Sequence, residues 1–310
     1  IEQALAERFP ALPLVRLIGD VKNLEHLRQV MQRWKPQVVF HAAAYKHVPL
    51  MEEHNAWAAL QNNTLGTWQA AREAARAGVE RFVLISTDKA VNPTNVMGAT
   101  KRAAEMVVSH LASQGHATRF MAVRFGNVLG SSGSVIPKFK EQIAKGGPVT
   151  VTHAEITRYF MTIPEAARLV VQAAAIGETG QVYVLDMGEP VRIVDLARDL
   201  IRLAGHTVDE IGIVYSGLRA GEKLYEELLA DADHTLPTPI ARLLIARIEA
   251  DVSRVSALID WALDPDSAVA ADVQRQLMRT VPEYQPVDET AAATSGETSF
   301  APAPRIGRSA

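Results

Sequence analysis

The chain has 310 residues, of which 48% are hydrophobic and 22% charged, with a formal net charge of -3 and no cysteine. This composition is typical of a globular protein with one large or two modest domains. The net charge is not positive and no stretch concentrates Lys and Arg, which argues against nucleic-acid binding. Without cysteine, disulfides and thiolate chemistry are excluded. No apolar run reaches the roughly 18 residues of a membrane-spanning helix, so we expect no membrane contact from this chain itself.

Strands and helices alternate along the first half of the chain. Residues 1–9 have the charge pattern of a surface helix, and we therefore expect the chain to begin within a fold. The pattern predicts strands at residues 15–18, 38–41, 81–85 and 120–124. It predicts helices at residues 24–34, 55–77 and 99–114. Such alternation is typical of an α/β fold with a doubly wound parallel sheet.

The second half is less regular. An amphipathic helix is predicted near residues 135–145, and Thr162 with Glu165 forms a capping box at the start of another helix. A strand at residues 182–185 precedes a helix that ends at Gly205. Residues 286–310 are rich in Ala, Thr, Ser, Gly and Pro, which predicts a disordered tail.

Polar groups that can carry chemistry follow the strand at residues 81–85. Ser86, Thr87, Asp88 and Lys89 place hydroxyls, a carboxylate and an amine at its carboxyl end, where open α/β sheets bind ligands. Lys101 in the next helix adds a second amine. These groups suffice for proton and hydride chemistry on a sugar, although adjacent Asp and Lys residues are more often a surface ion pair.

The strand at residues 38–41 also ends in a candidate site. The small side chains of Ala42, Ala43 and Ala44 would let a flat ligand approach the backbone, or would simply permit tight helix packing. Lys46 and His47 add polar groups at the same edge. The nearby histidines are too far apart in sequence for one helical metal face, so we predict no metal site.

Five motifs stand in the order of a known family: residues 41–49 (HAAAYKHVP), 86–90 (STDKA), 124–131 (RFGNVLGS), 157–162 (TRYFMT) and 219–223 (RAGEK). Over about residues 1–229 the chain resembles the extended short-chain dehydrogenases/reductases, and among them the nucleotide-sugar 4,6-dehydratases of bacterial polysaccharide and glycan biosynthesis. The resemblance implies a Rossmann-like sheet, incomplete at its N-terminus because the family's first strand and glycine-rich phosphate loop would lie upstream of Ile1. It also implies a smaller C-terminal substrate-binding domain.

The resemblance divides the chain into an NAD-binding part at residues 1–146 and 157–178, and a substrate-binding part at residues 147–156 and 179–285. Met97 stands where most of the superfamily carries a tyrosine four residues before the lysine, here Lys101. This replacement resembles the large membrane-anchored dehydratases that act on UDP-N-acetylglucosamine, and it favours retention of the C5 configuration.

By this resemblance, Lys101 positions the nicotinamide ribose, Thr87 orients the C4 hydroxyl, Asp88 protonates the departing C6 hydroxyl and Lys89 removes the C5 proton. Asp88 would have to hold a proton near neutral pH, and Lys89 would need a lowered pKa. The predicted catalytic set is Thr87, Asp88, Lys89, Met97 and Lys101.

The resemblance also implies binding residues for NAD and for a UDP-sugar. The predicted NAD contacts are Asp20, Val21, Ala42, Ala43, Ala44, Lys46, Asn63, Ser86 and Lys101. The predicted substrate contacts are Lys46, His47, Asn127, Ser131, Arg158, Arg219 and Glu222. Alternatives are a helix N-cap for Asp20, helix packing for Asn63, a turn for Asn127, and ion pairs of Arg158 and Arg219 with Glu155, Glu165 or Glu222.

We therefore expect an NAD-dependent lyase, a UDP-N-acetylglucosamine 4,6-dehydratase. Enzymatic alternatives are a C5-inverting dehydratase and a 4-epimerase, and a further alternative is a truncated nucleotide-sugar-binding module without activity. We expect a cytoplasmic location, a parent protein anchored to the inner membrane by upstream helices, and a homo-oligomer as one possible assembly.

Overall fold

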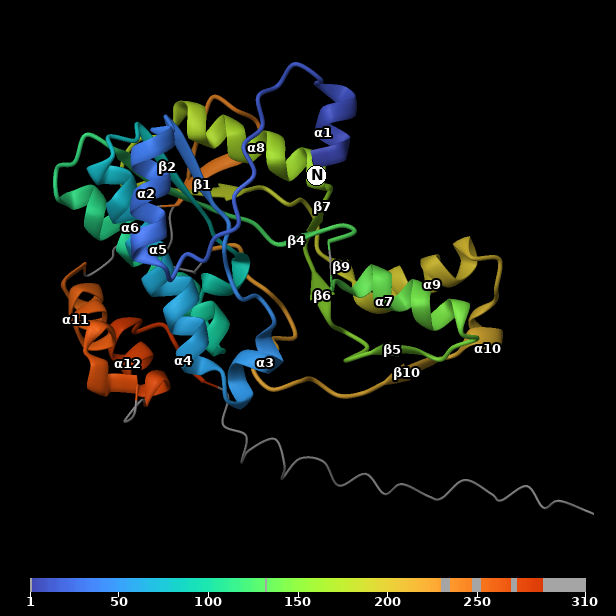
Figure 1. The fold of residues 1–310 in the computed structure, drawn as a ribbon. Coiled ribbons are helices and arrows are strands. Elements are labelled where there is room, and N and C mark those ends of the chain that lie inside the picture. The colour runs from blue at the N-terminus through green and yellow to red at the C-terminus, as the bar shows by residue number, and fades with distance from the viewer. Residues whose placement is uncertain (1, 132, 230–234, 247–251, 269–271, 287–310) are drawn as a thin grey trace, which may run out of the picture.

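A six-stranded sheet forms the centre of the molecule. The computed structural model describes residues 2–131, 133–229, 235–246, 252–268 and 272–286 (Figure 1). Four strands pair in parallel, in the order β1 (Val38–His41), β2 (Arg81–Ile85), β3 (Arg119–Arg124) and β8 (Val182–Leu185). Two antiparallel strands complete the sheet, β12 (Leu243–Ala246) and β11 (Thr235–Pro237). The parallel α/β architecture and the four parallel strands predicted from the sequence are confirmed.

Helices cover both faces of this sheet because alternate strand residues point to opposite sides. Phe82 and Leu84 of β2 belong to one hydrophobic core, whereas Val83 belongs to the other. The first core is closed by α2 (Leu24–Trp34), α4 (Ala56–Ala59), the π-helix η1 (Leu60–Leu65), α5 (Gly66–Arg76), α6 (Val96–Ser113), α11 (Val252–Leu263) and α12 (Val273–Thr280). The second is closed by α8 (Ile163–Ile176), which begins with the predicted capping box.

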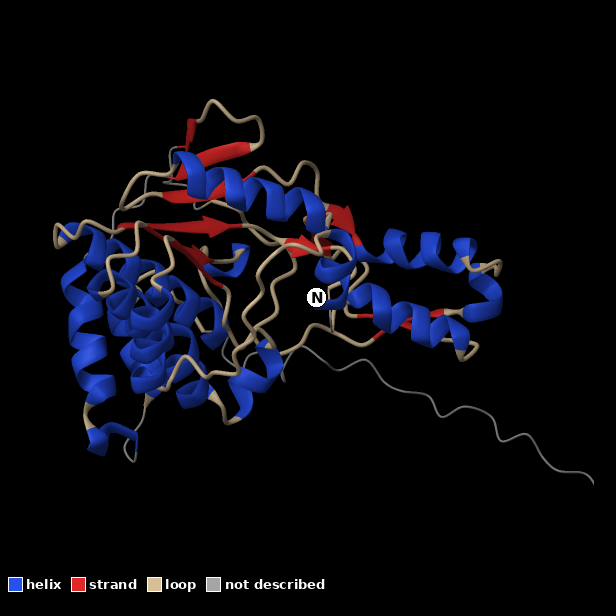
Figure 2. Cartoon of the chain, turned by 45° about the horizontal axis from the view of Figure 1, so that its top comes forward, coloured by secondary structure: helices blue, strands red, loops and turns tan. Residues whose placement is uncertain are grey.

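A separate lobe extends from one end of the sheet, as Figures 1 and 2 show. It has its own hydrophobic core between α7 (Val135–Ala144), α9 (Ile193–Leu203), α10 (Val208–Ile211) and the parallel pair β5 (Val149–Val151) and β10 (Ile213–Tyr215). Two short pairs lie between sheet and lobe: β4 (Asn127–Val128) with β7 (Phe160–Met161), and β6 (Thr157–Arg158) with β9 (Val191–Arg192).

The packing of these elements differs from the expected division of the chain. Helix α7, expected in the cofactor-binding part, packs in the lobe. Strands β8 and β12 and helices α11 and α12, expected in the substrate-binding part, pack with the central sheet. A boundary drawn along the sequence cannot show whether an element packs in the lobe or with the central sheet. That depends on which surface, distant in sequence, the apolar face of the element packs against.

The predicted strand at residues 15–18 is wrong. Residues 15–18 take no strand conformation, and Ile18 is completely exposed. None of the described strands forms hydrogen-bonded ladder pairs with this segment. The predicted N-terminal surface helix is present as α1 (Glu2–Arg8). The predicted disordered tail lies, except for Pro286, outside the described residues.

Short helices complete the described part: α3 (Val48–Glu53), the 3-10 turn η2 (Asp88–Ala90) and η3 (Pro265–Ala268). None of the helices in the described ranges has the length and apolar character required to cross a bilayer.

Candidate active site

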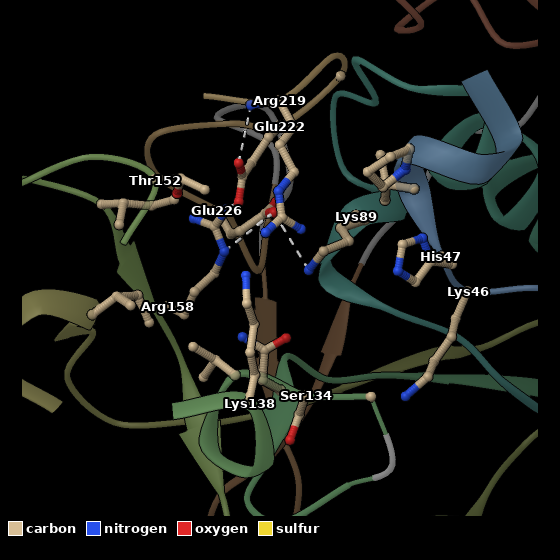
Figure 3. A pocket seen from close by; sticks show the side chains of 18 of the residues that line it. Lys46, His47, Lys89, Ser134, Lys138, Thr152, Arg158, Arg219, Glu222 and Glu226 are labelled. Atoms are coloured by element: carbon tan, nitrogen blue, oxygen red, sulfur yellow. Dashed lines mark hydrogen bonds and ion pairs between the residues drawn. The ribbon is translucent and has the colours of Figure 1, made fainter. Parts of the chain in front are cut away.

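A cavity of about 310 Å³ lies between the carboxyl ends of the parallel strands and the lobe (Figure 3). Its walls come from the loop after β1, from the turns after β2 and β3, from the start of α7, from β5 and β6, and from residues 219–226. Ligands of open α/β sheets bind at this end of the strands.

The seven side chains predicted from the sequence to contact substrate all line this one cavity. They are Lys46, His47, Asn127, Ser131, Arg158, Arg219 and Glu222. Arg158 also makes the alternative contact considered for it, since its Nη2 lies 3.4 Å from Glu222 Oε1. The ion pair and the position in the cavity wall therefore occur together.

Thr87, Asp88 and Lys89 form a contact triad at the end of β2. Thr87 Oγ1 donates to Asp88 Oδ1 at 2.9 Å, and Lys89 Nζ donates to the same oxygen at 3.0 Å. The second oxygen, Asp88 Oδ2, is buried and has no hydrogen-bond partner among the described residues. Gly126 is the residue beside it, since a Cβ at this position would lie 3.2 Å from Oδ2.

The position of this triad follows from backbone contacts. Thr87 caps η2, the single turn that presents Lys89 to the cavity, and the Asp88 amide donates to Phe125 O at 3.1 Å. Asn95 caps α6 by accepting from the Gly98 amide at 2.7 Å. A Cβ at residue 98 would lie 2.1 Å from Lys89 O, so only glycine lets α6 pack this closely against the turn.

Lys89 has a second carboxylate neighbour, which the sequence reasoning missed. Glu226 Oε1 lies 3.3 Å from Lys89 Nζ and 3.8 Å from Arg158 Nε. Burial by itself would lower the pKa of Lys89, but the negative charges of Asp88 and Glu226 outweigh burial and raise it. The expected lowering of the Lys89 pKa is therefore wrong for this arrangement.

Glu226 belongs to residues 219–227. We call this segment the strap because side-chain hydrogen bonds hold it against the turn that follows Lys89. Thr94 Oγ1 and Asn95 Nδ2 both donate to Gly221 O, at 3.1 and 3.0 Å. Lys223 Nζ donates to Val91 O at 3.2 Å and lies 3.0 Å from Glu227 Oε1. The available sequence signal was the pair of acidic residues that follows the RAGEK motif. Lys138 of α7 lines the same cavity and was also missed.

Lys101 and Ser86 both lie at the carboxyl end of β2. Lys101 Nζ donates to Ile85 O at 2.7 Å, and burial lowers its pKa to about 8, partly opposed by the charge of Glu105. Ser86 Oγ donates to Glu105 Oε1 at 2.6 Å. Met97 is buried in the first hydrophobic core, one helical turn before Lys101. Its thioether cannot relay a proton.

Asn63 fixes the loop after β1 in place. Its amide is buried in η1, accepts from the Tyr45 amide at 2.7 Å, and donates to Tyr45 O and Thr100 Oγ1 at 3.0 Å each. A π-helical turn is often found at a functional site. The hydrogen bonds of the Asn63 side-chain amide go to Tyr45 and Thr100 of the protein itself. This geometry makes Asn63 a residue that positions the loop after β1. Ala42 and Ala43 in that loop are exposed, and Ala44 is half-buried.

Asp20 and Val21 lie near the same loop. Asp20 pairs with Lys22 at 2.8 Å, and this contact lowers the pKa of Asp20, while Lys22 lies over the Tyr45 ring. Val21 packs against Gly66. Asp20 is not the N-cap of the following helix, because Asn23 fills that position and accepts from the His26 amide.

The chain is similar in sequence to known proteins over most of its length. Residues 1–247 match the family described as "Polysaccharide biosynthesis protein". Over 74% of its length the chain is 60% identical to the capsular polysaccharide biosynthesis protein CapD of Staphylococcus aureus, of which it covers 38%. It is 33% identical, over 75% of its length and 67% of the relative, to a UDP-N-acetylglucosamine 4,6-dehydratase (inverting) of Campylobacter jejuni.

Solved structures show the same fold. Pen from Bacillus thuringiensis superposes with a TM-score of 0.71 and is 34% identical, over 79% of this chain and 77% of that one. The UDP-glucose 4-epimerase of Thermus thermophilus, solved with NAD, has a TM-score of 0.61 at 21% identity, over 67% and 74%. The chain spans less than two fifths of CapD and of the probable polysaccharide biosynthesis protein EpsC of Bacillus subtilis. It belongs to the polysaccharide biosynthesis protein family, within the extended short-chain dehydrogenases/reductases that include nucleotide-sugar dehydratases and epimerases.

Proposed function

We propose that this chain carries the catalytic site of an NAD-dependent 4,6-dehydratase that acts on UDP-N-acetylglucosamine. The observation that carries the proposal is the Thr87, Asp88 and Lys89 triad, in which a hydroxyl, a carboxyl and an amine meet within 3.0 Å. Lys89 of this triad lines a cavity with several cationic side chains. The similarity to a dehydratase of the same substrate supports the choice of sugar.

The residues at the strand ends fit the nicotinamide end of the cofactor. The exposed Ala42 and Ala43 leave the backbone open to a flat ring, and Lys101 holds an amine beside the end of β2. When bound, NAD would supply a reversible acceptor for the hydride of the sugar. In this proposal Lys101 would hold the nicotinamide ribose, and Asp20 with Val21 would contact the adenine.

The chain's own groups carry the proton transfers of the dehydration. Thr87 orients the C4 hydroxyl of the sugar. Lys89 removes the proton from C5, the C6–O bond breaks, and Asp88 gives its proton to the departing hydroxyl, so that one water leaves and a C5–C6 double bond forms. Asp88 Oδ1, which accepts from both Thr87 and Lys89, is the oxygen that we assign to hold this proton.

The diphosphate of the substrate would bind the cationic walls of the cavity. The planar guanidinium groups of Arg158 and Arg219 suit phosphate oxygens. Asn127 on β4 would contact the nucleotide, and Lys46 and His47 would approach from the loop after β1.

The test is chromatography coupled to mass spectrometry of UDP-N-acetylglucosamine incubated with the chain and excess NAD, because chromatography separates epimers of equal mass. We expect a product that has lost one water from the sugar. An isomer of unchanged mass would indicate a 4-epimerase, and unchanged substrate that nevertheless binds would indicate a binding module. Carrying out the reaction in D2O and determining the product configuration at C5 separates retention from inversion.

Asp88→Asn is expected to lower the rate of dehydration by about 100- to 10,000-fold, because the amide cannot protonate the leaving group. Substrate affinity, measured by calorimetry with UDP-N-acetylglucosamine, should change little. Asp195→Asn is the matched control, since Asp195 lies on α9 in the lobe and pairs with Arg192 and Arg198. Full activity in Asp88→Asn would refute the role of Asp88.

A further inference from the structure

Two carboxylates and one guanidinium face the Lys89 amine. Asp88 Oδ1 lies 3.0 Å from Lys89 Nζ, Glu226 Oε1 lies 3.3 Å from it, and Arg158 Nε approaches Glu226 at 3.8 Å. The side chain of Asp88 is fully buried, and that of Glu226 is 4% exposed. Figure 3 shows Lys89, Glu226 and Arg158 converging on the cavity. The other charged or titratable groups lining this cavity are Lys46, His47, Lys138, Arg219 and Glu222.

The proposed reaction needs the opposite protonation of the ion pair that this geometry favours. Lys89 must be a neutral amine to take a proton, and Asp88 must be a neutral acid to give one. Transfer of one proton along the hydrogen bond from Lys89 Nζ to Asp88 Oδ1 produces both forms at once, with no other reactant. Burial favours the neutral pair, because each charged form loses its hydration.

Glu226 opposes this transfer. It is a second negative charge against the Lys89 ammonium, and its position is set by the strap rather than by η2. Building on the proposed function, we propose that Glu226 is a positioning residue that holds the proton on Lys89, and so controls how readily the Asp88 and Lys89 ion pair converts into the neutral acid and base.

Replacement of Glu226 by glutamine tests the proposal without any substrate. Lys89 is partly exposed, so its free amine can be labelled with acetic anhydride over a range of pH and the modified peptide quantified by mass spectrometry. Glu226→Gln removes a charge that favours the ammonium, so the labelling midpoint should move to lower pH. A shift of half a unit to one unit would raise the labelling rate at a given pH below the midpoint by about 3- to 10-fold.

Glu227→Gln is the matched control. Glu227 is the neighbouring strap carboxylate, but it contacts Lys223 and Asn92 instead of Lys89. The Lys89 midpoint should not move in this variant. Glu226→Asp, which keeps the charge but withdraws it by one methylene, should give a smaller shift and serves if Glu226→Gln fails to fold. An unchanged or higher midpoint in folded Glu226 variants, or an equal shift in Glu227→Gln, would overturn the proposal.

Dehydration gives the second measurement. The rate should be higher in Glu226→Gln than in the unmodified chain at pH values where Asp88 and Lys89 share one proton, because more of the pair is then neutral acid and base. The fall in rate at high pH, where the pair loses this proton to solvent, should begin at lower pH in Glu226→Gln. If the unmodified chain forms no dehydrated product, the proposed function fails, while the labelling midpoints still decide the role of Glu226. If dehydration occurs but the labelling midpoint of the variant does not move, only the role of Glu226 fails.

Discussion

Glu105→Gln is expected to lower the free energy of unfolding by about 3–5 kcal/mol, because it removes the carboxylate charge that pairs with the buried guanidinium of Arg124. Glu105 is fully buried, and its two oxygens accept from Arg124 Nε and Nη2 at 2.8 and 2.7 Å. Arg124 is itself 2% exposed. Glu105 also accepts from Ser86, directly before the triad. Chemical denaturation of the unmodified chain and the variant measures the difference.

Glu73→Gln is the matched control for this buried carboxylate. Glu73 is also buried, but its partners Arg28, Arg72 and Arg76 have side chains that are 37%, 29% and 55% exposed, so water can solvate them after the change. We expect a clearly smaller loss of stability than for Glu105→Gln. Equal losses of stability in Glu73→Gln and Glu105→Gln would contradict the prediction that burial of the Arg124 guanidinium makes the Glu105 change more destabilising.

The effect of Glu105 also depends on pH. Burial would raise the pKa of Glu105, but the charges of Arg124 and Arg102 outweigh burial and lower it below its ordinary value of 4.5. A carboxyl whose native pKa is lowered stabilises the fold above the unfolded pKa, and this contribution is lost as the pH falls through the native pKa. The stability difference between the unmodified chain and Glu105→Gln should therefore be full above about pH 4.5 and shrink in more acidic solution.

Gly98→Ala is expected to reduce dehydration about 100-fold, since a displacement of roughly 1 Å at a catalytic group costs that much. The new Cβ would lie 2.1 Å from Lys89 O, which is backbone and cannot rotate away. Either α6 or η2 must shift, which should also cost about 1–3 kcal/mol of stability. Product formation and the melting temperature measure the two effects.

Gly19→Ala is the control for this substitution. A Cβ at residue 19 would lie 3.0 Å from the ring end of His26, a side chain that can rotate away. Its activity and melting temperature should stay close to those of the unmodified chain. Unchanged activity in Gly98→Ala would show that the contact between α6 and η2 does not position the triad.

The local elements could be predicted from the sequence because their causes are local. Apolar periodicity and capping residues are properties of neighbouring residues, and they identified the strands β1, β2, β3 and β8 and helix α8 with its capping box. The polar residues after β2 were also recognisable, because chemistry at the carboxyl end of a parallel strand leaves a short contiguous motif.

The tertiary structure decided what depends on partners distant in sequence. The segment at residues 15–18 has strand composition but forms no ladder pairs with any described strand, and it is irregular and exposed. The Lys89 pKa depends on Glu226, which reaches the site only because the strap packs over the turn that follows Lys89. Sequence alone thus determined which groups stand at the strand ends, whereas folding set the charges around them, because electrostatic interactions depend on distance and burial in space.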